Sequence, residues 1–231
     1  MRGIDFNGRH SIKDMDLYVA DLDISPPKKR HMTQTIPFMN GAYDFSNIYG
    51  VNTYEERTLT YSFEIIAPTQ AHLNLIKIKV LAWLLNGEKG ELRDDGIPGY
   101  YFIAKCISVT EDDNRDKTTI KATFSAYPFK ICDSYEGENL WDPFCFETDV
   151  LQRTRFTVDK AQKVSIYNVG VVDVIPVIYA SETFEIIMNE NKYTVSPGVT
   201  QNDKFRFKVG NNELLLKGTG EIQFFFRKEV L

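Results

Sequence analysis

The sequence contains few of the residues that build metal sites and disulfide frameworks. Its 231 residues include three cysteines and three histidines. The cysteines show no CxxC spacing and are odd in number, which argues against a disulfide framework or a zinc site and favours synthesis in a reducing compartment. His10, His31 and His72 form no HExxH motif and no compact cluster. We therefore expect each histidine to be solvated or hydrogen-bonded within the fold.

Long apolar runs and an excess of positive charge are also missing. The longest apolar run, Val80 to Leu85, is far shorter than the roughly 20 residues of a membrane-spanning helix. No apolar run follows Arg2, so no secretory signal is predicted. The 27 Lys and Arg residues against 32 Asp and Glu residues leave a formal charge of −5. Such a chain has no overall attraction to nucleic acid or anionic lipid, so we expect neither as a binding partner.

Motifs for catalysis and for ligand binding are incomplete. Gly218-Thr219-Gly220 lacks the third glycine and the following helix of a dinucleotide loop. The segment from 112 to 123 opens like a calcium loop but lacks its glycine and its bidentate glutamate, so a charged hairpin tip is the better account. Asp94 and Asp95 are sequence neighbours that cannot be shown to flank a sugar bond. We therefore predict no enzyme, no cofactor and no metal site.

Alternation of apolar and polar residues is abundant. Between Thr58 and Ile65 every second residue is apolar, which is typical of a half-buried strand. The same period recurs in four further segments: Ile120–Ala126, Phe184–Met188, Phe205–Val209 and Ile222–Phe226. Polar turn signals separate them, which favours antiparallel hairpins and a mainly β protein.

One segment has helical spacing and predicts a helix over about 70–86. The residues of its apolar stripe are Leu73, Ile76, Val80, Trp83 and Leu84. Four more apolar residues widen this stripe: Leu75, Ile78, Ala82 and Leu85. We therefore expect the helix to pack across a sheet, with Asn74, Lys77 and Lys79 on its solvent side.

The chain is expected to form two domains. Residues 1–133 combine strands with the helix, which predicts an α+β, sandwich-like domain. Residues 134–231 have only short strands at the turn spacing typical of a β-sandwich. The linker is predicted at about 130–150, where the sequence is polar and lacks apolar periodicity.

The segment from Ile36 to Ser46, IPFMNGAYDFS, followed by Tyr54-Glu55-Glu56-Arg57, resembles the opening of siphophage distal tail proteins, also called Dit. The resemblance continues through the helix with Trp83 and the run from Leu92 to Tyr101, and it ends at Phe129. The second domain is similar in outline to the galectin-like sandwich of that family. The residues that match the family motif are Pro37, Gly41, Tyr43, Asp44, Arg57 and Trp83.

The resemblance implies a structural subunit without enzymatic activity. Members of the family form a hexameric ring that joins the tail tube to the tail tip, so the implied partners are further copies of the chain, the tail tube protein, the tape-measure protein and the tail-associated tip protein. The implied location is the virion tail tip after synthesis in the host cytoplasm. First domains would surround a channel for DNA, and sandwich domains would project outward.

Two other functions remain open from the residues. The first is a stand-alone carbohydrate-binding β-sandwich protein, for which Trp141, Asn168 and Asn211 are the nearest cues, and the second is a tail-associated hydrolase. No subunit-interface residue is assigned, although the polar segments Asp21–His31 and Glu111–Lys117 are candidate arms toward a neighbour.

Two motif residues and one cysteine carry structural expectations. Gly41 is expected in a turn that needs backbone angles available to glycine. Arg57 is expected either to support the first domain or to form a surface pair of little value. Cys106 lies within a predicted strand and is expected to be a small buried side chain.

Overall fold

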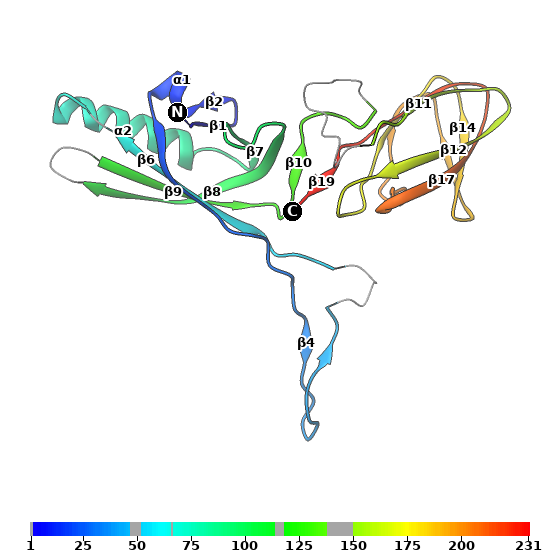
Figure 1. Cartoon of the computed structure of the whole chain (residues 1–231), viewed down its shortest axis with the longest axis horizontal. Helices are drawn as coiled ribbons and strands as arrows, with labels where there is room; N and C mark the ends of the chain where they lie inside the picture. The colour runs from blue at the N-terminus through cyan, green and yellow to red at the C-terminus, as the bar shows by residue number, and fades with distance from the viewer. Residues whose placement is uncertain (1, 47–51, 66, 114–117, 138–149) are drawn as a thin grey trace. The chain divides into compact units, whose positions relative to one another are not determined.

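A computed structural model describes residues 2–46, 52–65, 67–113, 118–137 and 150–231. The chain divides into two compact units, Met1–Lys130 with Leu231, and Ile131–Val230 (Figure 1). We call them unit 1 and unit 2. Residues 138–149 of the predicted linker lie outside the described residues.

Unit 1 is built on one antiparallel sheet with the strand order β2-β1-β7-β8-β9-β6-β3. Its strands are β1 (Ile4–Phe6), β2 (Arg9–His10), β3 (Tyr18–Ile24), β6 (Arg57–Ile65), β7 (Gly90–Asp94), β8 (Tyr100–Asp113) and β9 (Thr118–Ala126). Its helices are α1 (Ser11–Met15) and α2 (Gln70–Leu85). The remaining strands, β4 (Thr33–Gln34) and β5 (Tyr43–Asp44), form a small sheet of their own.

The predicted alternation decides which face of this sheet is buried. In β6, Leu59, Tyr61 and Phe63 are fully buried while the residues between them are partly or fully exposed. In β9, Ile120 and Phe124 are buried in the same way. Because β6 and β9 pair from Arg57↔Ala126 to Ile65↔Thr118, these side chains form one continuous apolar layer. The mainly β fold predicted from the sequence is confirmed.

Helix α2 covers this apolar layer. It begins after Thr69, whose side chain accepts a hydrogen bond from the His72 amide, as expected of an N-cap. Val80 and Leu84 are fully buried, and the Trp83 indole donates to the Phe6 carbonyl at 3.0 Å. No helix among the described residues is long and apolar enough to cross a membrane.

Two expectations about α2 were wrong. Leu75, Ile78, Ala82 and Leu85 do not widen the buried stripe, because all four are exposed. Lys77 does not face solvent: it is buried, and its ammonium lies 2.5 Å from Asp113 and 3.1 Å from Glu111 at the end of β8. The aliphatic stem of Lys77 thus packs against the sheet while its charge is neutralised by two carboxylates.

Strand β8 contains a bulge at Ile107. Cys106 pairs with Phe124 and Ser108 pairs with Thr123, so Ile107 has no partner in the register. The extra residue reverses the alternation of β8. Before the bulge the even-numbered residues face the core, and after it Val109 packs against the core instead.

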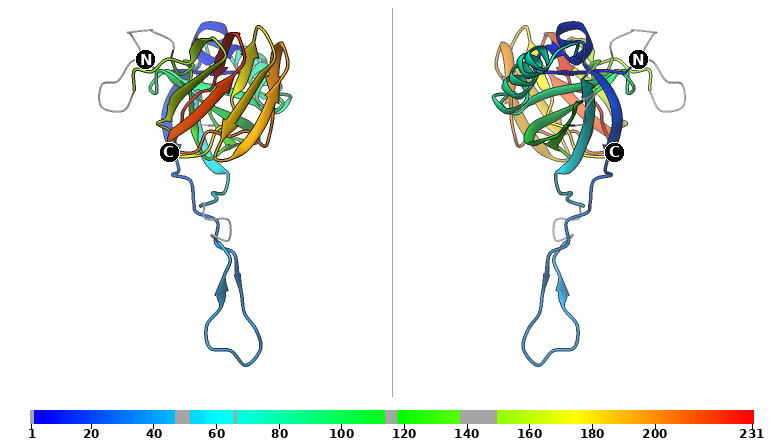
Figure 2. Two further views of the ribbon diagram at one scale, coloured as in Figure 1. Left: turned by 90° about the vertical axis from the view of Figure 1, so that its right-hand side faces the viewer. Right: turned by 90° about the vertical axis from the view of Figure 1, so that its left-hand side faces the viewer.

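Unit 2 is a sandwich of two four-stranded antiparallel sheets, ordered β11-β18-β13-β16 and β12-β17-β14-β15 (Figure 2). The first sheet contains β11 (Arg155–Val158), β13 (Val177–Ala180), β16 (Gly198–Gln201) and β18 (Gly220–Phe225). The second contains β12 (Ala161–Asn168), β14 (Phe184–Met188), β15 (Asn191–Val195) and β17 (Gly210–Lys217). In addition, β10 (Lys130–Cys132) pairs with β19 (Glu229–Val230).

The core of the sandwich is rich in phenylalanine. Phe207 contacts Phe205, Phe224 and Phe226 with ring centroids 5.1 to 5.6 Å apart in edge-on geometry. The strand predicted over Phe205–Val209 was wrong, because only Phe207 forms a bridge, with Val174. Its alternation reflects aromatic burial in an irregular segment.

Candidate assembly surfaces

A hairpin arm extends from unit 1 between β3 and β6. We define the arm as residues 26–46 and 52–56. Thr33 pairs with Asp44 and Gln34 with Tyr43 near its end, and Lys29 bridges Tyr54 nearer its base. The arm stands apart from the sheet in Figures 1 and 2. Of the candidate arm Asp21–His31 suggested by the sequence, Asp21–Ile24 belong instead to β3.

The arm exposes apolar side chains that a solitary subunit would bury. Phe38 is completely exposed at the tip, and the others are between 42% and 54% exposed: Met32, Ile36, Tyr43 and Phe45. Tyr43 and Phe45 touch each other with ring centroids 6.2 Å apart. Large apolar side chains gathered on an extended element mark an interaction surface.

The tip of the arm is also strained. The Met39 amide donates to the Ile36 carbonyl at 3.2 Å, which closes a turn with Pro37 and Phe38 at its centre. Phe38 has φ +68°, a left-handed conformation that side chains of its size rarely adopt. Backbone strain of this kind concentrates at functional sites.

Four of the predicted motif residues lie together on the arm. Pro37 begins the tip turn, and Gly41 has φ +90°, which fits the predicted need for glycine. Tyr43 and Asp44 form β5. The Ser46 hydroxyl and amide both lower the pKa of Asp44 by hydrogen bonding, and the Ser46 hydroxyl in turn accepts from the Met32 amide at 2.8 Å. These bonds fasten the two sides of the arm together.

Arg57 anchors the base of the arm. Its side chain is 6% exposed, and its Nε donates to the Ser25 carbonyl at 2.9 Å while Nη1 donates to the Pro128 carbonyl at 3.3 Å. Burial lowers the pKa of the guanidinium, which also lies 5.4 Å from the centre of the Phe102 ring. The surface-pair alternative for Arg57 is therefore wrong.

Trp83, the sixth motif residue, is separate from the arm. It lies in the core of unit 1, where its ring contacts those of Phe6 and Phe63 at 6.4 and 6.3 Å between centroids. The motif thus combines an exposed arm, its anchor and a core tryptophan, and it forms no single site.

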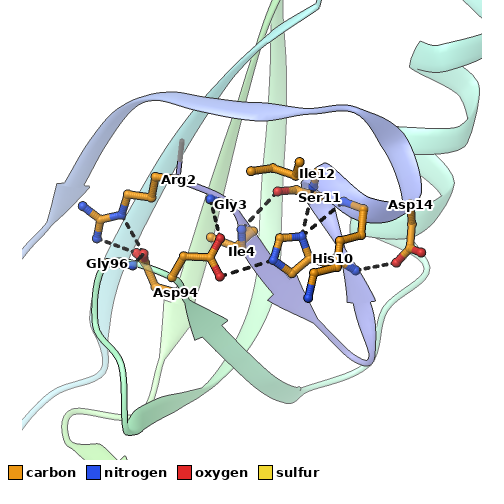
Figure 3. A network of polar contacts seen from close by, with 11 residues as sticks. Arg2, Gly3, Ile4, His10, Ser11, Ile12, Asp14, Asp94 and Gly96 are labelled. Atoms are coloured by element: carbon orange, nitrogen blue, oxygen red, sulfur yellow. Dashed lines mark hydrogen bonds and ion pairs between the residues drawn. The ribbon is translucent and has the colours of Figure 1, made fainter.

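The adjacent aspartates Asp94 and Asp95 serve the fold. The Asp94 carboxylate is buried, and it accepts hydrogen bonds from Arg2 at 2.6 and 2.8 Å (Figure 3). It also accepts a hydrogen bond from the Tyr61 hydroxyl at 3.0 Å. Asp95 accepts from the Gly3 amide at 2.9 Å and contacts His10 at 3.3 Å. The pair therefore ties the first residues of the chain to the turn after β7.

His10 has a second role in the same network. Its Nδ1 accepts from the amides of Ile12 and Lys13, so the imidazole acts as the N-cap of α1, a helix that the sequence did not predict (Figure 3). The expectation that His10 is hydrogen-bonded within the fold is confirmed. Among the described residues, no group of His, Cys, Asp and Glu side chains is arranged to hold a metal ion.

The outer face of the unit 1 sheet is rich in hydroxyl groups. We call it the hydroxyl face, and its members are Thr58, Thr60 and Ser62 on β6, Thr119, Thr123 and Ser125 on β9, and Ser108 and Thr110 on β8. None of them is buried. On β3, β6, β8 and β9, four carboxylates and two ammonium groups share this face: Asp21, Asp23, Glu64, Asp112, Lys105 and Lys121.

The nearest sugar-binding cues do not form a site. The Asn168 amide is buried and donates to the carbonyls of Val172 and Phe207, while its oxygen accepts from Gly170. All of these partners are backbone groups, so the Asn168 side chain stabilises the local backbone. Asn211 is hydrogen-bonded to Ser165. Trp141 lies outside the described residues.

Comparison with known proteins identifies the family. Residues 10–126, just over half of the chain, match the family described as the phage tail protein RIFT-related domain. The chain belongs to this family. The match confirms the resemblance of the first domain to phage tail proteins, and it spans the arm, Arg57 and Trp83.

The fold of this phage tail protein is also found among solved structures. The crystal structure of SPP1 Dit, described as a paradigm of the hub adsorption apparatus in phages that infect Gram-positive bacteria, matches with a TM-score of 0.70 at 14% identity, covering 100% of both chains. A chain of the phage p2 baseplate in its activated conformation with Sr matches with a TM-score of 0.45 at 8% identity, covering 99% of this chain and 98% of that one. Curated proteins include no match.

Proposed function

We propose that the chain is a distal tail protein, a structural subunit without enzymatic activity that forms a hexameric ring between the tail tube and the tail tip. The arm is the observation that carries this proposal. It exposes Phe38, Tyr43 and Phe45 and contributes little to the core of its own unit. In a ring, a heterologous contact from one subunit to the next would cover these side chains.

The reach of the arm suits such a contact. From Ser25 to Phe38 an extended chain spans about 40 Å at roughly 3.3 Å per residue, which exceeds the radius of a domain of this size. At the base, Arg57 and the hydrogen bond from the Ser25 amide to the Thr58 carbonyl fix the direction in which the arm leaves the sheet. A fixed base lowers the entropy that is lost when the tip binds.

We further propose that the ring encloses a channel that passes DNA, and the hydroxyl face supports this part of the proposal. Small hydroxyl side chains and an excess of carboxylates over ammonium groups form a wall that repels phosphate weakly and offers it few cations. A monomeric sugar-binding protein would need neither this face nor the arm. The tail tube protein, the tape-measure protein and the tip protein are the proposed partners, and unit 2 is proposed as a galectin-like sandwich that projects outward.

Light scattering behind a sizing column, with negative-stain imaging, tests the ring. We expect about 160 kDa for six copies of the 26.6-kDa chain, and six-fold rings in the images. Phe38→Gly places glycine at a positive φ and removes the exposed phenyl group. The variant should therefore keep an unchanged or higher melting temperature but fail to form the hexamer. Val199→Ser, which alters an exposed residue of unit 2, is the matched control and should assemble normally. A strict monomer for the unmodified chain at every concentration, or rings with Phe38→Gly, would refute the proposed role of the arm.

A further inference from the structure

Helix α2 carries a second apolar stripe on the face opposite the core. Its residues are Ala71, Leu75, Ile78, Ala82 and Leu85, which we call the outer stripe. All five are exposed, and the three large side chains are 58%, 64% and 50% exposed. The inner stripe, with Val80 and Leu84, is already buried against the sheet. The outer stripe is therefore not needed to hold α2 in place.

The spacing of the outer stripe suits a helical partner. Successive members are separated by four, three, four and three residues, which is the a and d pattern of a coiled-coil seam. Two of its five residues are alanines, which lets the backbone of a second helix approach closely at these positions. A strand or an irregular loop does not match a seam of this period.

The charges beside the outer stripe identify the chemistry of the partner. Helix α2 contains no Asp or Glu, and Lys79 flanks the stripe on the exposed surface beside His72. The charge of Lys77 is already neutralised by Asp113 and Glu111. The unmatched charge at the stripe is therefore positive, and carboxylates on the partner would complement it.

A second copy of α2 fits this surface poorly. Antiparallel pairing of two copies about Ile78, the middle of the stripe, places Lys79 near Lys79 of the other copy, so like charges face each other. The only other helix among the described residues, α1, has five residues and is too short to fill the seam. Neither helix of a second copy thus suits the outer stripe, which leaves a helix of a different protein as the occupant to test.

We propose that the outer stripe of α2 is a docking site for an amphipathic helix of another protein, whose apolar seam is flanked by Asp or Glu. This site does not depend on ring formation, because α2 and the arm are separate elements of unit 1. Peptide binding at the outer stripe and formation of the ring can therefore be measured independently on the same preparation, so that failure of one proposal is distinguished from failure of the other.

Two synthetic helices of the same length test the proposal. Both have leucine and alanine at the seam; the first has glutamate at the flanking positions and the second has lysine. Binding to the full chain is measured by fluorescence anisotropy in about 20 mM salt, where surface charges are least screened. We expect the glutamate peptide to bind about threefold more tightly than the lysine peptide, as one surface ion pair with Lys79 would give.

Two variants distinguish the contribution of the apolar stripe from that of the charge beside it. Ile78→Glu should weaken binding of the glutamate peptide by about tenfold, and Lys79→Glu should reverse the preference between the two peptides. Val199→Glu places the same charge at an exposed apolar residue of unit 2 and should change nothing. Circular dichroism confirms that each variant is folded. The proposal would be overturned if both peptides bound equally or if Ile78→Glu left peptide binding unaltered. It would also be overturned if the chain bound neither peptide and instead associated with itself through a contact that Ile78→Glu abolishes.

Discussion

Replacing Arg57 with alanine removes the anchor between the arm and unit 1. The guanidinium joins two segments distant in sequence, since its acceptors are the carbonyls of Ser25 and Pro128. Arg57→Ala leaves both carbonyls without this donor in a site that is 6% exposed. It also removes the aliphatic stem that packs beside Phe102.

The cost of Arg57→Ala follows from these contacts. Hydrogen bonds from a charged donor contribute about 1.5 to 3 kcal/mol each, so two contribute roughly 3 to 6 kcal/mol. Desolvation opposes this gain, as the lowered pKa of Arg57 indicates. We expect a net loss of about 2 to 3 kcal/mol in the free energy of unfolding of unit 1, which corresponds to a fall of roughly 6 to 9 °C in its melting temperature.

Differential scanning calorimetry measures this loss, because two separate units give two transitions. Arg57→Ala should lower the transition of unit 1 and leave that of unit 2 unchanged. Arg57→Lys keeps the charge but reaches only one carbonyl, so its effect should be about half as large. Arg9→Ala, at an exposed position of β2, is the control. A transition of unit 1 within about 1 °C of the unmodified protein would show that the two bonds do not stabilise the fold.

Three further predictions concern other residues. Burial raises the pKa of Cys106 to about 11, so iodoacetamide at pH 8 should alkylate this thiol only after denaturation, as measured by peptide mass. Equal rates of alkylation in the folded and the denatured protein would contradict its burial. Lys77 holds the pKa of Asp113 below its ordinary value of 3.8, so the Lys77–Asp113 ion pair stabilises unit 1 above pH 3.8 and this contribution disappears as the pH falls further. Asp113→Asn should therefore make the melting temperature of unit 1 less dependent on pH over that acidic range. An unchanged dependence on pH would argue against the ion pair. Thr60→Lys with Thr123→Lys should create DNA binding in a gel shift at low salt, and the unmodified chain is expected to cause no shift. A double variant that also causes no shift would argue against the proposed channel wall.

The sequence predicts the strands of unit 1 well because one face of its sheet is buried. Thr58–Ile65 alternates cleanly, and the structure places β6 over Arg57–Ile65. The helix predicted over about 70–86 is α2, Gln70–Leu85. In both cases the period of the side chains records which face meets the core.

The same pattern misleads where both sides of an element are apolar. The sequence of α2 has two apolar stripes, and periodicity alone does not show which of them packs against the core. Ile78 was therefore predicted to be buried, although it is exposed. Lys77 was assigned to solvent because its carboxylate partners are on β8, 34 to 36 residues away. Burial of a charge depends on such distant partners, which local patterns do not record.

The candidate sites show the same limit. The arm motif was recognised from residues 36–46, but its exposure was not, because nothing local distinguishes an extended arm from a buried hairpin. The roles of Asp94 and Asp95 depend on Arg2, Gly3 and His10, more than 80 residues earlier in the chain. Contacts of this range come from the topology of the sheet, in which β1 pairs with β7.

The bulge at Ile107 lets β8 hold one extra residue without a change in the pairing on either side of it. Cys106 pairs with Phe124 and Ser108 with Thr123, which are successive positions of the ladder. Deleting Ile107 would therefore join these positions in regular alternation and would keep Ser108 and Thr110 on the outer face and Glu111 and Asp113 on the side of Lys77. An insertion after Val109 that is not bulged out would instead exchange the sides of the residues that follow it and leave a buried ammonium without its counterions. We expect relatives to tolerate the loss of the bulged residue more readily than a change in the number of residues beyond it.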